Sequence, residues 1–372
     1  MHSQDDSTVR GPMFSMGELQ GLGILARSPG ALAFRSSAAV RLPAVSDAPS
    51  LEGLQVTMPV PAPITVEAVL ERHEALSRAV ASRRDRAPGE EVASGDDVLL
   101  DVIGFANGRL IPFSARSDWW TEAVPDPLFP GFFESLPGSK VGETLSVELM
   151  LPMDYPVESL RGMAALFAVE LKAAREVRPL DEQSPDYFTA LGRGATLDEV
   201  MEHLAGELAA ERDAQDVRKC QDAVLREVAR RTRTEVPRSL VEEELRRRWS
   251  EAEYPVLVRL GVPPEQIPEA FEGWLNDAAT RDEAEYRLRL GLSLRAIATH
   301  ERLKPVREEA KVLFERLADS TGMSHEELGQ LLQSNKDVRQ RFDSMAMHAM
   351  AVSHVLSKVT VLEEPTAVGA AG

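Results

Sequence analysis

The sequence predicts an α+β protein, in which a small antiparallel β-rich domain is followed by a large helical domain. Between residues 96 and 177, short stretches of alternating apolar and polar residues are separated by Gly and Pro, which is typical of strands joined by turns. From residue 197 to residue 361 the apolar residues recur at helical spacing instead. Proline cannot donate the helical hydrogen bond, so the prolines of this region divide it into separate helices: Pro237, Pro255, Pro263, Pro264, Pro268 and Pro305.

Composition and charge exclude several classes of protein. The chain has 372 residues, enough for two or three domains, and 43% of them are hydrophobic. It contains no apolar run near the roughly 18 residues of a membrane span, and its start, MHSQDDSTVR, is not a secretory signal. We therefore expect no membrane partner. Sixty acidic residues against 42 basic ones give a net charge of −18, which opposes general binding to nucleic acids.

Isolated residues of reactive types predict structural roles. Cys220 is the single cysteine, which excludes an intramolecular disulfide and suits the reducing cytoplasm. His348 and His354 are six residues apart, so they do not share one helix face, and we expect no metal site there and no cofactor. Nearby methionines either fill a helix core or form an adaptable surface for unfolded clients: Met345, Met347 and Met350.

The elements before the β-rich domain are short. Residues 1–50 are rich in Ser, Ala, Gly and Pro, and predict either a hairpin or a flexible tail. Residues 51–95 follow as a strand-like piece at 54–60, then a helical pattern over 64–84 that opens at Thr65, a candidate N-cap. His73 in this pattern is expected to be packed or half-exposed. Residues 87–97 form a charged, turn-rich linker.

The β-rich domain contains three clear strand patterns. They are VLLDVIGF at 98–105, TLSVELMLP at 144–152 and ALFAVELKAA at 165–174, and the domain ends near Val177. Helical patterns then extend to residue 361, and residues 362–372 are expected to be a disordered tail.

One stretch carries a specific motif. The series Pro-Gly-Phe, Leu-Pro-Gly and Lys-Val-Gly-Glu lies at fixed spacing in LFPGFFESLPGSKVGETLSVELMLPMDYP, residues 128–156. With LDVIGFANGRLI at 100–111 and GMAALFAVEL at 162–171, it resembles the FKBP-type peptidyl-prolyl isomerase domain, in the version found inside bacterial trigger factor. The resemblance continues into VRKCQDAVLREVARRTRTEVPRSLVEEELRRR at 217–248, which is similar to the family's helical chaperone domain.

The resemblance implies an organisation and an activity. Residues 51–95 would be a remnant strand, helix and linker of the family's N-terminal domain, 96–177 an FKBP-like isomerase domain and 178–361 a chaperone domain with helical arms. The implied function is that of a cytoplasmic molecular chaperone with peptidyl-prolyl cis-trans isomerase activity. Its partners would be unfolded or proline-containing polypeptides, and no cofactor is implied.

Such an isomerase site needs apolar side chains. Rotation about an X-Pro bond breaks amide resonance and meets a barrier of about 18–20 kcal/mol. A dry apolar cradle disfavours the charge-separated resonance form and so lowers this barrier without an acid, a base or a nucleophile. The resemblance implies Phe132 as the pocket floor, Trp119 and Phe167 as its walls, and the backbone at Phe129 as the group that holds the substrate carbonyl. The implied set is completed by catalytic Leu128 and Tyr155 and by substrate-binding Val102 and Ile111.

Three positions depart from the family pattern. Val102 and Ile111 stand where the family usually has aromatic residues, and Pro112 stands where it usually has an acid. Two alternatives therefore stay open: the aromatic residues fill the core of a small β-domain, or the chain is a catalytically weak binding module or dedicated chaperone for one partner.

The ribosome-binding loop of trigger factors has little counterpart here. The family loop reads Gly-Phe-Arg-x-Gly-Lys, whereas residues 33–38 read Ala-Phe-Arg-Ser-Ser-Ala and lack both glycines and the lysine. Only 15 residues separate Arg35 from Leu51, too few for the helices of the family's N-terminal domain. We expect no ribosome binding.

Overall fold

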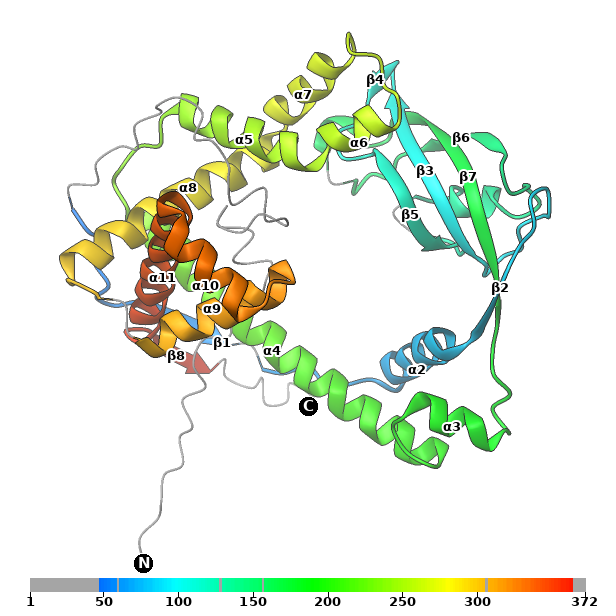
Figure 1. Ribbon diagram of the computed structural model, residues 1–372, viewed down its shortest axis with the longest axis horizontal. Coiled ribbons are helices and arrows are strands. Elements are labelled where there is room, and N and C mark those ends of the chain that lie inside the picture. The colour runs from blue at the N-terminus through cyan, green and yellow to red at the C-terminus, as the bar shows by residue number, and fades with distance from the viewer. Residues whose placement is uncertain (1–46, 59, 127–128, 156, 305–306, 364–372) are drawn as a thin grey trace, which may run out of the picture. The chain divides into compact units, whose positions relative to one another are not determined.

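The computed structural model describes residues 47–58, 60–126, 129–155, 157–304 and 307–363 (Figure 1). Its contacts divide the chain into two compact units. We call the described parts of Met1–Pro61, Ala214–Val241 and Glu283–Gly372 the helical unit, and those of Ala62–Asp213 and Glu242–Asp282 the sheet unit. Among the helices that the structure describes, none is both long enough and apolar enough to cross a membrane.

The sheet unit is built on a six-stranded antiparallel sheet. The strand order is β2-β7-β3-β4, with β5 paired to β3 and β6 paired to β7. The three predicted strands are present, and the predicted α+β class with an antiparallel sheet is confirmed. Three strands carry no clear pattern in the sequence; in β5 the adjacent Trp119 and Trp120 interrupt the alternation. The bounds are β2 Ser82–Asp85, β3 Asp97–Ala106, β4 Arg109–Leu110, β5 Arg116–Glu122, β6 Thr144–Met150 and β7 Ala164–Arg178.

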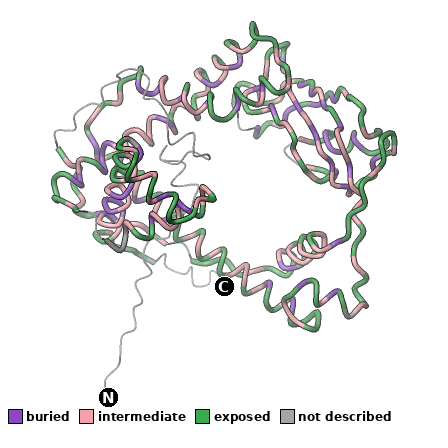
Figure 2. The backbone as a smooth tube through the Cα atoms, viewed as in Figure 1, coloured by how far each residue is buried: buried purple, intermediate pink, exposed green. Residues whose placement is uncertain are grey.

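The central strand β3 gives the sheet two faces. Its residues alternate between buried and half-buried along the whole strand, because successive side chains point to opposite sides. Val98, Leu100 and Val102 lie in the main hydrophobic core, whereas Ile103 belongs to a second core on the other side. Figure 2 shows this alternation of burial along the strands of the sheet.

The helix before the sheet begins where the sequence predicts. Thr65 caps α2, Val66–Val80, and its hydroxyl accepts a hydrogen bond from the Ala68 amide at 3.2 Å. The helical pattern was predicted to continue to residue 84, and this is wrong, because β2 begins at Ser82. Pairing with β7, where Arg84 lies opposite Glu176, overrides the local preference for a helix.

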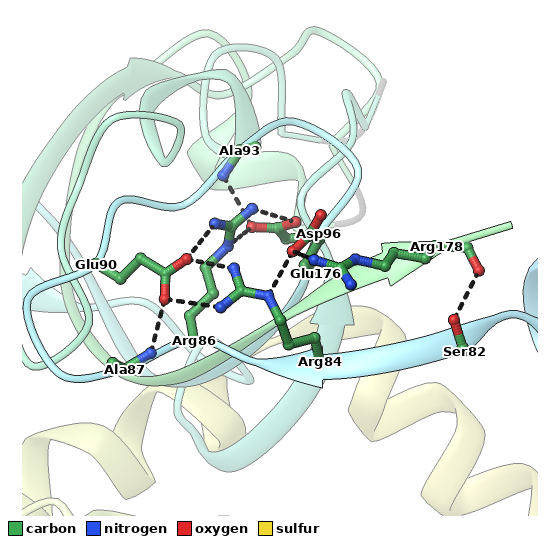
Figure 3. A network of polar contacts seen from close by, with 9 residues as sticks. All are labelled: Ser82, Arg84, Arg86, Ala87, Glu90, Ala93, Asp96, Glu176 and Arg178. Carbon is green, nitrogen blue, oxygen red and sulfur yellow. Dashed lines mark hydrogen bonds and ion pairs between the residues drawn. The ribbon is translucent and has the colours of Figure 1, made fainter.

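The predicted linker at 87–97 is an ordered part of the sheet unit. Figure 3 shows the polar network that holds it: Arg86 donates to Asp96 at 2.5 Å, and Arg84 donates to Glu176 at 2.6 Å and also pairs with Glu90. The guanidinium of Arg84 lowers the pKa of Glu90 to about 2. Val92, between these residues, is buried in the main core. The segment does form turns, as its composition predicts, and ion pairs between its charged residues hold these turns in place.

Helices pack at the other end of the sheet unit. α3, Pro185–Leu191, and the start of α4, Leu197–Arg231, form a small core with α2. At its centre the hydroxyl of Tyr187 lies 2.6 Å from the Ser77 hydroxyl and 2.9 Å from Nε2 of His73. His73 is half-buried, which confirms its predicted packed role.

The helical unit surrounds an aliphatic core. It contains the end of α4 with α8 Ala278–His300, α9 Arg307–Thr321, α10 His325–Ser334 and α11 Lys336–Leu356. Val228, Leu294 and Val355 are fully buried where α4, α8 and α11 meet. Met345 and Met350 are buried too, so the core interpretation of these methionines is confirmed, and Met347 is half-buried against the aliphatic core. Cys220 is also buried, consistent with a structural role.

A short parallel sheet joins the two ends of the described chain. β1, Gln55–Met58, pairs with β8, Thr360–Glu363. The predicted helical pattern from residue 197 to residue 361 is therefore wrong at its end, where Thr360 and Val361 begin β8. Leu362 and Glu363 also belong to β8 rather than to a disordered tail. Four residues are too few to show an alternation, and the partner strand lies at the opposite end of the sequence. Residues 1–46, with the predicted hairpin or tail, and 364–372 lie outside the described residues.

Three further helices belong mostly to the sheet unit. They are α5 Arg238–Ala252, α6 Tyr254–Arg259 and α7 Ile267–Asn276. Figure 1 shows α6 and α7 beside β4 and β5. The sequence grouped them with the other helices in one domain, whereas their apolar residues pack on the sheet. The predicted domain boundaries themselves stay predictions.

Candidate functional site

Four of the predicted site residues form one aromatic cluster on the face of the sheet that the main hydrophobic core covers. We call this face the inner face. The rings of Phe132 and Phe167 are 5.5 Å apart and nearly perpendicular, at 81°. Phe129 lies edge-on to Phe167 at 5.8 Å and to Tyr155 at 6.2 Å. Edge-to-face pairs of this kind are the preferred arrangement of aromatic rings. The structure therefore brings together residues that come from three separate segments of the chain.

Local structure explains how these rings meet. Phe167 points inward from β7, and Phe129 and Phe132 lie in the turn that leads into a short 3₁₀ helix, Phe133–Ser135. Gly104 on β3 is paired with Phe167, and a Cβ atom at Gly104 would lie only 2.5 Å from Cε1 of that ring. Only glycine leaves room for Phe167 to lie flat against the strand. The cluster thus depends on a residue that carries no side chain.

The remaining predicted residues lie around the cluster or outside the description. Val102 and Ile111 are buried in the same core, at 3% and 0% exposure. Trp119 is half-buried, and its ring contact is with Phe133 at 6.0 Å rather than with Phe132 or Phe167. Leu128 lies outside the described residues.

One aromatic residue of the cluster was missed in the sequence. Phe133 packs against Phe132 at 4.9 Å and connects Trp119 to the other rings. The sequence signal that could have identified Phe133 is its position directly after Phe132, because neighbouring residues in a 3₁₀ turn can both face one core. Phe132, Phe133 and Phe167 are each no more than 4% exposed.

The cluster offers shape and dryness rather than acid-base chemistry. Tyr155 is the ionisable residue among the predicted set, and burial raises the pKa of its phenol. Near the turn, the hydroxyl of Ser135 donates to the carbonyl of Phe132 at 2.6 Å, which fixes the backbone beneath the rings. Within the part of the chain that the structure describes, no group of three or more side chains is placed to hold a metal ion. The catalytic and binding roles of these residues stay predictions.

A second core covers the opposite face of the sheet. Its buried members come from the loop before β5 and from α5, α6 and α7, and Ile103 and Leu110 pack against them from the sheet. The ring of Phe113 packs against Trp274 with centroids 4.4 Å apart and the ring planes tilted by 41°. No sequence pattern predicted this core. Its buried residues are Ala115, Trp249, Leu257, Ala270 and Trp274.

Comparisons with known proteins find similarity to trigger factors. The family model described as the C-terminus of bacterial trigger factor protein matches residues 196–357. The trigger factor of Methylobacterium sp. (strain 4-46) is 30% identical over 304 residues, which are 81% of this chain and 60% of that protein. The trigger factor of Halothermothrix orenii is 28% identical over 248 residues, 66% of this chain and 57% of the relative.

The chain spans between about half and about three fifths of the length of such relatives. The trigger factor of Novosphingobium aromaticivorans, for example, is 28% identical over 73% of this chain but only 52% of its own length. A solved structure described as "Promiscuous Substrate Recognition in Folding and Assembly Activities of the Trigger Factor Chaperone" aligns with a TM-score of 0.34 and 14% identity, over 83% of this chain and 71% of that one.

Proposed function

We propose that this chain, which is similar to trigger factors over most of its length, is a chaperone that holds unfolded polypeptides and catalyses cis-trans isomerisation of their X-Pro bonds. The holding activity is assigned to the helical region, on the match of residues 196–357 to the family's C-terminus. The isomerase activity is assigned to the aromatic cluster of the sheet unit. We place the protein in the cytoplasm, where its single cysteine would stay reduced.

One observation carries the isomerase assignment. The rings of Phe129, Phe132, Tyr155 and Phe167 pack together on one face of the sheet, with centroid distances from 5.5 to 6.3 Å. Three of these four ring pairs are edge to face, and the pair Phe129–Phe132 is tilted. A proline ring that packs against such rings leaves water, and its amide loses the solvation that favours the charge-separated resonance form. The barrier to rotation then falls without any proton transfer. A site built from buried rings fits this reaction, because the reaction needs no catalytic acid.

Accessibility favours a second candidate, a binding module with little catalysis. Phe132, Phe167 and Val102 are each 3% exposed, so a substrate has to enter past the half-buried Phe129 and Trp119. A cluster that does not open would keep the fold of an isomerase and serve only as a rigid base for the surfaces that grip a partner. The two candidates differ in one measurable property, the rate of X-Pro isomerisation.

The decisive experiment compares two truncations in the same sheet. We expect the purified chain to accelerate cis-to-trans conversion of a short X-Pro peptide. Phe129→Ala should lower kcat/KM about tenfold, the rate equivalent of the roughly 1.4 kcal/mol that one aromatic contact contributes. Phe105→Ala is the matched control, because Phe105 is also half-buried on this sheet but lies outside the cluster. A wild-type rate equal to the uncatalysed rate would contradict the isomerase assignment and favour the second candidate, the binding module.

We also propose that the protein acts away from the ribosome. Residues 33–38 keep the Phe-Arg pair of the family loop, but neither glycine and no lysine. The net charge of −18 opposes docking on ribosomal RNA. The chain should fail to co-sediment with ribosomes at physiological salt. Co-sedimentation that disappears with Arg35→Ala would contradict this and would assign a working loop to residues 33–38.

A further inference from the structure

One loop connects the two faces of the sheet. Residues 111–115 run from β4 to β5, with Ile111 buried in the core of the aromatic cluster and Ala115 buried in the core on the other side. The amide of Ile111 donates to the carbonyl of Gly104 at 2.9 Å, directly beside the ring of Phe167. Any change in this loop therefore acts on both faces.

The middle of the loop has an unfavourable backbone conformation. Phe113 has a φ of 66°, in the left-handed region that bulky residues avoid because Cβ approaches the carbonyl oxygen. Such a conformation persists only when the surroundings hold it. The guanidinium of Arg116 donates to the Phe113 carbonyl at 2.9 Å, which fixes one side of the peptide unit. The amide of Phe113 is held by a residue from the helices.

That residue is Glu253, between α5 and α6. Its side chain is only 4% exposed, and its carboxylate accepts from the Phe113 amide at 2.8 Å and from the indole nitrogen of Trp274. Burial raises the pKa of Glu253, which reflects the cost of removing the carboxylate from water. A buried acid with two aimed donors is a specific arrangement, since either donor would be left unsatisfied without it.

Packing around Glu253 presses the helices onto the same loop. The ring of Phe113 packs against Trp274. Gly273 on α7 lies so close to Pro112 that a Cβ atom on Gly273 would be 2.9 Å from Cγ of Pro112. At the edge, Arg259 on α6 pairs with Asp118 on β5, and Arg109 on β4 pairs with Glu269 on α7. These outer pairs are exposed and contribute little. The buried carboxylate is the polar anchor.

We propose that Glu253 is a positioning residue for the aromatic pocket. It holds Phe113 in its left-handed conformation and thereby sets the placement of Ile111 in the wall of the pocket. The helices α6 and α7 then act as a clamp on the isomerase-like sheet, through a contact that spans more than a third of the sequence. Its importance for catalysis rests on the proposed isomerase function, whereas its effect on the loop does not.

The test follows the loop directly in the full-length protein. NMR would record the methyl resonance of Ile111 and the exchange rate of the Phe113 amide in the wild type and in Glu253→Ala. We expect a shifted Ile111 methyl resonance and at least about tenfold faster exchange at Phe113, since the amide loses its buried acceptor. Glu265→Ala is the control, because Glu265 is an exposed acid in the turn between α6 and α7, and it should change neither signal.

A second variant keeps the test decisive if Glu253→Ala does not fold. Glu253→Gln keeps the volume and one acceptor oxygen. Its NH2 group, however, cannot accept a hydrogen bond, so one of the two donors, the Phe113 amide or the Trp274 indole, loses its partner. This variant should move Ile111 in the same direction by a smaller amount. An Ile111 resonance that stays in place while Phe113 exchange rises would overturn the positioning role, and so would unchanged exchange.

Catalysis is measured separately on the same samples. With an active wild type, Glu253→Ala should lower kcat/KM for an X-Pro peptide about tenfold, while Glu265→Ala leaves it unchanged. An inactive wild type would refute the proposed isomerase function alone, because the Ile111 and Phe113 signals still decide whether Glu253 sets the loop.

Discussion

The two faces of the sheet are covered in different ways. The inner face is covered by neighbouring segments of the chain, and its aromatic rings come from residues 129–167. The outer face near Ile103 is covered by helices from residues 242–282, far along the sequence. The first face carries the buried aromatic cluster that we propose as the isomerase site, whereas the second has a buried carboxylate that accepts a hydrogen bond from the amide of Phe113. The comparison shows that the proposed site and the elements that cover the opposite face come from different parts of the chain.

The largest expected effect concerns the inner face. Phe167→Ala should lower the free energy of unfolding of the sheet unit by about 3–5 kcal/mol, because it leaves a cavity among rings that cannot fully close. Gly104→Ala should also destabilise, since its Cβ would meet the Phe167 ring at 2.5 Å. In the double variant the new methyl group enters the space that the ring vacated. Chemical denaturation should therefore give a cost smaller than the sum of the two, by about 1 kcal/mol or more.

If the costs of Phe167→Ala and Gly104→Ala simply add in the double variant, the proposed dependence of the Phe167 ring on Gly104 is contradicted. Additive costs would mean that Gly104 is required by its own backbone and not by the ring. Amide exchange at Val228 and Val355 in the helical unit is the internal control, because both residues lie in a separate core and should be unaffected.

A smaller effect is expected on the outer face. Alanine is favoured over glycine within a helix by about 1 kcal/mol. Gly206→Ala in α4 should realise this gain, because nothing lies within 4 Å of the added Cβ atom. Gly273→Ala in α7 should instead lose about 1–2 kcal/mol, because its Cβ would press on Pro112. Exchange protection of the Trp274 indole N–H measures the difference, and an equal gain in both variants would show that α7 does not press on the loop.

The two faces also differed in how far the sequence predicted them. The resemblance to the isomerase domain, which the spacing of Pro-Gly-Phe and Leu-Pro-Gly carries, implied Phe132 and Phe167 as parts of one pocket. Phe133 was missed because adjacent residues normally face opposite ways, and the 3₁₀ turn brings both inside. Glu253 gave no signal, since an acid in the charged run SEAEYP is typical of a solvated helix surface. Only the long-range contact shows that it is buried.

The smallest effect is a pH dependence of opposite sign in the two units. Burial raises the pKa of Glu253, so the folded clamp binds protons more readily than the unfolded chain and gains stability as pH falls through this raised pKa. Burial lowers the pKa of His348 in the helical unit, so that unit loses stability as pH falls below the ordinary histidine value of about 6.5. Protection factors at Trp274 should rise relative to those at Val355, within a few-fold. Protection factors that change in the same direction at Trp274 and Val355 would contradict the opposite pH dependence of the two units.

The most direct test of the central claim is to observe both faces while an X-Pro peptide is added. Aromatic resonances of Phe129 and Phe167 report on the inner face, and the indole N–H of Trp274 reports on the outer one. If the aromatic cluster is the substrate site, titration of the full-length protein should shift the Phe129 and Phe167 signals most and Trp274 least. A largest shift at Trp274, or no shift at either face, would contradict the assignment of the site.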